Sequence, residues 1–164
     1  MSMISPGRTV WIERATIIFV TFAYLLVFNR ITPHGDALRV VRQIDDGQLL
    51  WNPNHLAFDP IGYAWYALLK ALAIPVSPLG SFEIIAGAAA IVSLLIFHAL
   101  LLRLGIKRAS ARLLSTGGLF ASQAFLTMAI SQYYFMVQMP FLLGALYQCV
   151  VFVEAEHADV LPCP

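Results

Sequence analysis

The polar residues that could do chemistry in this sequence gather in one stretch, between the first two apolar segments. Within it His34 and Asp36 form an HxD pair, and His55 follows the side-chain amides of Asn52 and Asn54. Two candidate ligands are too few for a metal site, so no metal is predicted. A carboxylate, an imidazole and amides could instead hold the head group of a lipid-linked substrate. The His55 imidazole could bind a phosphate or simply hydrogen-bond the loop.

The composition excludes several classes of protein. The chain has 164 residues, of which 60% are hydrophobic and 12% charged, and its mean hydropathy is +0.78; a soluble domain carries about 25% charged residues. A net charge of +1 provides no basic field for nucleic acid, and the high hydrophobicity excludes a disordered chain. Cys149 and Cys163 form no CxxC metal-binding pair. A polytopic membrane protein is the class that remains.

Four windows are long and apolar enough to cross a membrane as helices, because a bilayer core about 30 Å thick takes roughly 20 apolar residues. The windows lie at about residues 10–28, 82–102, 113–130 and 137–153, and the last two are the weaker ones. The sequence therefore predicts an all-α fold, with a single membrane domain over residues 1–164 and about four transmembrane helices. A long first external loop would occupy residues 29–81.

Basic residues set the expected orientation of these spans. Six lysines and arginines flank the start of the first window and the end of the second. They are Arg8, Arg14, Arg103, Lys107, Arg108 and Arg112. Because cytoplasmic loops are enriched in such cations, we expect a cytoplasmic amino terminus and an extracytoplasmic first loop. The first window also fits a secretory signal, although no small-x-small cleavage site follows Phe28.

Two short helices are predicted within the external loop. Apolar residues recur at helical spacing over residues 36–46, and Asp36 stands at the position of an N-cap. Residues 61–74 follow as a second helix, in which Trp65 and Lys70 suit the membrane surface. Asp36 thus has two interpretations, a helix cap or a reactive carboxylate held near the outer leaflet.

Two further ionisable residues lie in or beside the second window. His98 falls within it, where an ionisable side chain is a functional candidate, but its place near the cytoplasmic end favours a structural role. Glu83 lies at the outer mouth of that span and could face the same pocket as Asp36. Asp46 and Asp59 are explained by the solvated end of one loop helix and the cap of the next.

Three motifs of the first loop, together with the order of the parts, resemble a known family. The motifs are His34-Gly35-Asp36, the run from Leu50 to Leu56, and the helix start Pro60-Ile61-Gly62-Tyr63. A cytoplasmic start, one span, an early acidic residue, an external loop with surface helices and then clustered spans resemble the opening of the GT-C type polytopic glycosyltransferases. The closest likeness is to bacterial members related to protein mannosyltransferases and to lipid A aminoarabinose transferase, over about residues 11–153.

The resemblance implies a hexosyltransferase that moves a sugar from a polyprenyl-phosphate carrier to an acceptor at the outer face of the bacterial plasma membrane. By position Asp36 matches the family's catalytic carboxylate, which would accept the proton of the attacking hydroxyl in an inverting displacement. The other candidates would bind the substrate and stabilise the leaving phosphate. They are His34, Arg39, Asn52, Asn54, His55, Gln132 and Tyr133. Gln132 stands where several relatives have an acidic residue, which argues against a metal-assisted reaction.

The chain is shorter than members of this family, which continue through further spans. The resemblance therefore implies a fragment of a larger GT-C module, active only with carboxyl-terminal spans or an additional membrane subunit. The alternative is a non-enzymatic four-span scaffold or a transporter subunit. Transporters keep polar residues or broken helices near the membrane midplane, whereas here the charges gather in the external loop. A decayed gene product without activity is a third interpretation.

Overall fold

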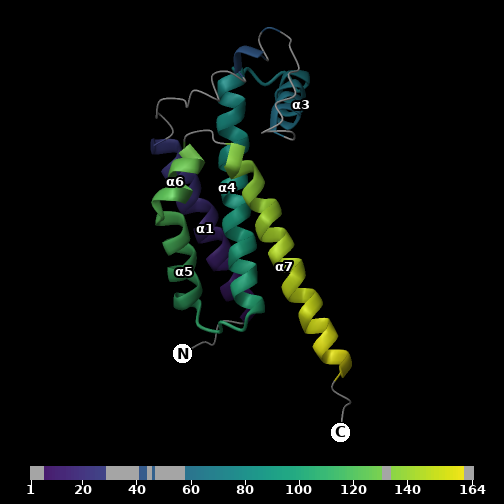
Figure 1. Ribbon diagram of the computed structural model, residues 1–164. Coiled ribbons are helices and arrows are strands. Elements are labelled where there is room, and N and C mark those ends of the chain that lie inside the picture. The colour runs from purple at the N-terminus through teal and green to yellow at the C-terminus, as the bar shows by residue number, and fades with distance from the viewer. Residues whose placement is uncertain (1–5, 29–40, 44–45, 47–57, 131–133, 161–164) are drawn as a thin grey trace.

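The computed structural model describes residues 6–28, 41–43, 46, 58–130 and 134–160. In this part of the chain the regular structure consists of six helices and a helical turn at residues 41–43, without strands (Figure 1). They are α1 (Pro6–Phe28), α3 (Phe58–Ala71), α4 (Pro78–Arg103), α5 (Ala109–Ala121), α6 (Gln123–Ile130) and α7 (Tyr134–Val160). The predicted all-α fold is confirmed for these residues.

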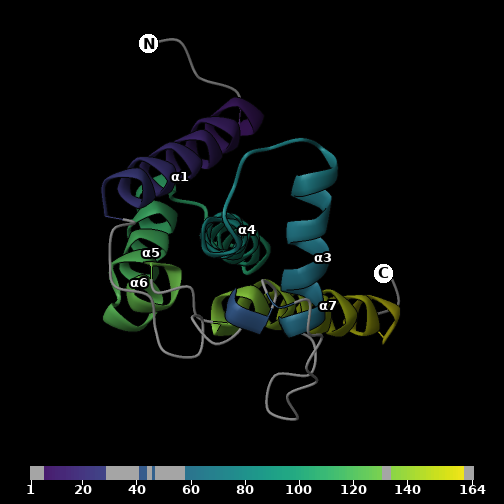
Figure 2. The ribbon, with the colours of Figure 1, turned by 90° about the horizontal axis from the view of Figure 1, so that it is seen from above.

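Helix α4 is the centre of the bundle, and the other five helices all contact it. Viewed along its axis, α4 has α1, α5 and α6 on one side and α3 and α7 on the other (Figure 2). Its buried face is built largely of small side chains, Ala86, Ala89, Ala90 and Ser93. Small residues let neighbouring helix backbones approach closely in membrane proteins, so the alanine-rich run of the sequence explains why α4 occupies the middle.

Among the described residues, three helices are long and apolar enough to cross a membrane. They comprise Gly7–Phe28, Pro78–Arg103 and Phe135–Glu156, and they include the predicted spans at residues 10–28, 82–102 and 137–153. Such lengths match the roughly 20 residues that a bilayer core requires. The chain therefore has the features of an integral membrane protein.

The predicted span at residues 113–130 is not one continuous helix. The helix is interrupted at Ser122, whose backbone is extended with ψ of 135°. The Ser122 hydroxyl donates to the Leu119 carbonyl at 2.8 Å and accepts from the Phe125 amide at 3.3 Å. One side chain thus ends α5 and caps α6. The structure shows three candidate spans where four were predicted, because a hydropathy window averages across such a local break.

Replacing Ser122 with alanine should lower the free energy of unfolding by about 1 kcal/mol, the usual loss when a helix cap is removed. Thermal unfolding in detergent would measure the change. Ser115→Ala is the matched control, because Ser115 is exposed on α5 and alanine is the better helix former. Equal stability of the Ser122→Ala variant and the unaltered protein would contradict the capping role.

Helix α3 lies beside the first turns of α4, at one end of the bundle and at a steep angle to α4 (Figure 2). The sequence predicted a helix over residues 61–74; the observed helix begins at Phe58, because Pro60 is tolerated in a first turn. It ends where Ala73 adopts a left-handed φ of 54°, and the Ile74 amide donates to the Leu69 carbonyl at 3.0 Å. This hydrogen bond is typical of a Schellman C-terminus.

The first loop helix, predicted over residues 36–46, is described only in its second half. Residues 41–43 are helical, and the Asp46 amide donates to the Arg42 carbonyl at 2.9 Å, as in a helical turn. Val41 packs against Phe82 of α4 and Val137 of α7. This turn therefore lies at the same end of the bundle as α3.

Candidate functional site

The eight site residues expected from the sequence all lie outside the described residues. They are the proposed base Asp36 and the substrate-binding candidates His34, Arg39, Asn52, Asn54, His55, Gln132 and Tyr133. The structure therefore neither brings them together nor separates them. What it does place is the framework on either side of them: the end of α1, the turn at residues 41–43, α3, and the start of α7.

The framework at this end is held by a close contact between α3 and α4. Gly62 lies so near the Phe82 ring that a Cβ at position 62 would be 2.2 Å from Phe82 Cε1. One turn further along α3, Trp65 Nε1 donates a hydrogen bond to the Ser81 carbonyl at 3.0 Å. We call these four residues the α3–α4 junction. It fixes the crosswise helix to the start of a membrane span.

An apolar groove runs between α1 and α4 in the same half of the bundle. It has a volume of about 370 Å³. Its lining includes Phe22 and Leu25 of α1 and Ile84, Gly87 and Glu83 of α4. The sequence placed Glu83 at the outer mouth of the span, and the structure puts it on this groove. The groove thus offers a mainly hydrocarbon surface with one carboxylate.

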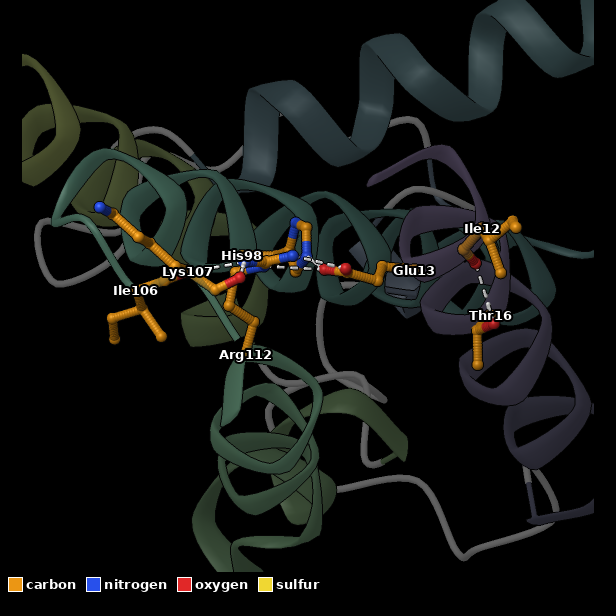
Figure 3. Close-up of polar contacts among 7 residues, drawn as sticks. All are labelled: Ile12, Glu13, Thr16, His98, Ile106, Lys107 and Arg112. Atoms are coloured by element: carbon orange, nitrogen blue, oxygen red, sulfur yellow. Dashed lines mark hydrogen bonds and ion pairs between the residues drawn. The ribbon is translucent and has the colours of Figure 1, made fainter. Parts of the chain in front are cut away.

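The opposite end of the bundle holds a buried ionic cluster, formed by Glu13 of α1, His98 of α4 and Arg112 of α5 (Figure 3). We call it the Glu13 cluster. Glu13 Oε2 accepts from Arg112 Nε at 2.9 Å and lies 2.6 Å from His98 Nε2. Glu13 Oε1 accepts from Arg112 Nη2 at 2.5 Å. The guanidinium therefore binds the carboxylate through two parallel hydrogen bonds, the strongest arrangement for this pair.

The same guanidinium also holds the connection between α4 and α5. Arg112 Nη1 donates to the Ile106 carbonyl at 2.6 Å and to the Lys107 carbonyl at 2.7 Å. The chain reaches this position through Gly105, whose φ of +78° follows the last turn of α4. Glycine adopts that conformation without a steric penalty. Arg112 consequently ties α5 to α1 and to the α4–α5 connection, and Glu13 adds α4 through its contact with His98.

The Glu13 cluster is suited to structure rather than to catalysis. Its side chains are 0% exposed for His98, 3% for Glu13 and 5% for Arg112, and both carboxylate oxygens are already occupied. His98 Nδ1 has no partner among the described residues. Within that part of the chain, no three His, Cys, Asp or Glu side chains come close enough to hold a metal ion.

Sequence reasoning identified only one member of this cluster. It singled out His98, assigned Glu13 to the first turn of a span, and counted Arg112 among the cytoplasmic cations. The sequence did contain one signal that could have identified the pairing of Glu13 with His98, namely the position of each residue along two antiparallel helices. Glu13 lies seven residues after the start of α1 and His98 five residues before the end of α4, so both fall at a similar depth, where unpaired charges are costly.

Over the described residues the fold defines a class: an all-helical bundle with helices long and apolar enough to cross a membrane, a crosswise helix at one end and a buried ionic cluster at the other. Comparison with known proteins adds no closer assignment, since no family model, curated protein or solved structure matches the chain.

Proposed function

We propose that the chain is part of a glycosyltransferase of the GT-C type, which transfers a sugar from a polyprenyl-phosphate carrier to an acceptor at the extracytoplasmic membrane face. The observation that carries the proposal is α3, an amphipathic helix that lies crosswise beside α4 and is fixed to it by the α3–α4 junction. In the sequence, the segment with Asp36 follows α1 and precedes α3, so its proposed location is this end of the bundle. A carboxylate here would meet the head groups of membrane lipids.

The orientation follows from the charges at the opposite end. Arg8 and Arg14 of α1 and Arg103, Lys107 and Arg108 around the α4–α5 connection lie where α1 begins and α4 ends. The positive-inside rule assigns that end to the cytoplasm. The resemblance to bacterial glycosyltransferases implies that the cell is a bacterium. The end with α3 then faces outward, where lipid-linked sugars are used by this class of enzyme.

The proposed chemistry is a single inverting displacement. The acceptor hydroxyl attacks the anomeric carbon, its proton passes to Asp36, and the sugar–phosphate bond breaks. The leaving group is already a phosphate, so stabilising its charge matters more than protonating it; Arg39 and His55 are the proposed donors. The apolar groove between α1 and α4 offers a surface for the hydrocarbon chain of the carrier.

Asp36→Asn tests this proposal. In membranes that contain the chain together with the further spans or membrane subunit that the resemblance implies, we expect transfer of a radiolabelled sugar from polyprenyl phosphate to fall at least a hundredfold, because loss of a general base costs about that much. Asp46→Asn is the control, since Asp46 is an exposed carboxylate of the same segment. Both variants should insert into the membrane like the unaltered protein. Undiminished transfer by the Asp36→Asn variant would refute the assigned base.

A transporter subunit is the second candidate, and the break at Ser122 favours it. Discontinuous helices often line substrate sites in transporters. A pocket of about 660 Å³ lies beside this break, lined by Gln123, Thr127 and Met128 of α6 and Phe135 of α7. If the unaltered protein transfers no sugar under the conditions above, this second candidate is preferred.

A further inference from the structure

The end of the bundle opposite α3 carries a group of exposed cations. Arg8, Lys107 and Arg108 are exposed, and Arg14 is half-buried. We call these four residues the basic end. Lys107 and Arg108 belong to the connection between α4 and α5, whereas Arg8 and Arg14 belong to α1. The group therefore draws on two separate parts of the sequence.

The acidic residues nearest to the basic end are engaged elsewhere. Glu13 is taken up by Arg112 and His98. Glu154 pairs with Arg103 at 2.5 Å. Glu156 lies beyond that ion pair on α7, which extends past the end of α4 (Figure 1). Within the described residues, then, the four cations of the basic end form no ion pair with an acidic side chain.

The Glu13 cluster also sets the position of these cations. Arg112 holds the carbonyls of Ile106 and Lys107 while it binds Glu13. The connection that carries Lys107 and Arg108 is therefore held beside α1, whose Arg14 follows Glu13 directly. This arrangement is preorganised, because the bonds from Arg112 add to the backbone hydrogen bonds that already hold Gly105 and Ile106 to the end of α4.

Trp11 locates the basic end at the depth of the lipid head groups. It lies on α1 between Arg8 and Arg14, and 72% of it is exposed. Tryptophan is enriched at the membrane–water interface, where its ring meets both hydrocarbon and head groups. Since α1 and α4 have the length of membrane spans, the anions closest to the basic end are phospholipid phosphates.

From this placement we infer that the basic end is a binding surface for anionic phospholipids, with phosphate head groups engaged by Lys107, Arg108, Arg14 and Arg8. Clustered cations at the cytoplasmic end of spans attract anionic lipids more strongly than zwitterionic ones. The inference does not depend on sugar transfer, because it concerns the other end of the molecule.

Lipid binding by the purified full chain in neutral detergent provides the test. Native mass spectrometry would compare dioleoyl phosphatidylglycerol with dioleoyl phosphatidylcholine. We expect preferential binding of phosphatidylglycerol. The double variant Lys107→Gln/Arg108→Gln should bind it roughly tenfold more weakly, since two cations near an anionic surface each contribute severalfold. Arg108 makes no side-chain capping bond to α5, so the fold should be retained.

A second double variant controls for net charge. Lys70→Gln/Arg42→Gln removes the same charge from exposed positions at the end with α3 and should weaken phosphatidylglycerol binding less than the first double variant does. An equal loss in both double variants, or no loss in the first, would overturn the inference. Millimolar inorganic phosphate should displace little lipid; complete displacement would show a site for free phosphate and contradict a lipid surface. Unchanged circular dichroism would confirm that both variants fold.

Discussion

Replacing Glu13 with glutamine is expected to lower the free energy of unfolding by about 3–5 kcal/mol, the range for breaking a buried ion pair from one side. The substitution leaves the Arg112 guanidinium at 5% exposure without its counter-ion. The amide keeps the shape of the carboxylate, so the loss reports charge rather than packing. Equilibrium unfolding in mixed micelles with increasing sodium dodecyl sulfate would measure it.

The ion pair between Arg103 and Glu154 is the matched control. Its N–O distance is also 2.5 Å, but its side chains are 42% and 43% exposed. Exposed pairs contribute only about 0–1 kcal/mol, so Glu154→Gln should have a small effect. A similar loss in the two glutamine variants would mean that burial does not determine the strength of the Glu13 cluster.

A double replacement separates the contribution of the ion pair from that of the hydrogen bonds between Arg112 and backbone carbonyls. Glu13→Leu/Arg112→Leu removes both charges, and apolar side chains of similar volume often replace a buried ion pair at little cost. We expect this variant to recover much of the stability that Glu13→Gln loses. Recovery would be incomplete, because Arg112 also holds the carbonyls of Ile106 and Lys107. A double variant less stable than Glu13→Gln would show that these backbone contacts matter more than the charge pair.

The long apolar helices were the predictable part of the fold. The windows at residues 10–28, 82–102 and 137–153 lie inside α1, α4 and α7, because membrane insertion depends on total hydropathy over about 20 residues. Ser122 shows where this approach fails. Its hydroxyl forms two local hydrogen bonds that divide a sufficiently apolar stretch, and summed hydropathy contains no information about such bonds.

The site was harder to predict, because its contacts join distant parts of the chain. Glu13 and Arg112 are separated by 99 residues, and each alone resembles an ordinary charge near the end of a span. The hypothesis about Asp36 has a different basis: it rests on the order of the parts and on a resemblance. Among the described residues, α3 supports the location proposed for the segment that carries Asp36. The role of the Asp36 carboxylate is tested by the activity of the Asp36→Asn variant.

Gly62→Ala is expected to destabilise the α3–α4 junction by about 1–3 kcal/mol, the usual cost of overpacking a tight contact. The new methyl group would lie 2.2 Å from Phe82 Cε1 and 2.4 Å from Cζ, so ring and helix must separate. Phe82 is 2% exposed and has little space to withdraw. The hydrogen bond from Trp65 to the Ser81 carbonyl should weaken, which a red shift of the tryptophan emission would detect.

Gly117→Ala is the control for this substitution, because a Cβ at position 117 of α5 meets nothing within 4 Å. Alanine should stabilise that helix by up to about 1 kcal/mol through its higher helix propensity. Opposite signs for the two glycine replacements would therefore show that steric contact dominates at position 62. Adding Phe82→Leu to Gly62→Ala should restore part of the loss. If Gly62→Ala were as stable as Gly117→Ala, α3 would not be fixed to α4, and the framework proposed for the Asp36 segment would lose its anchor.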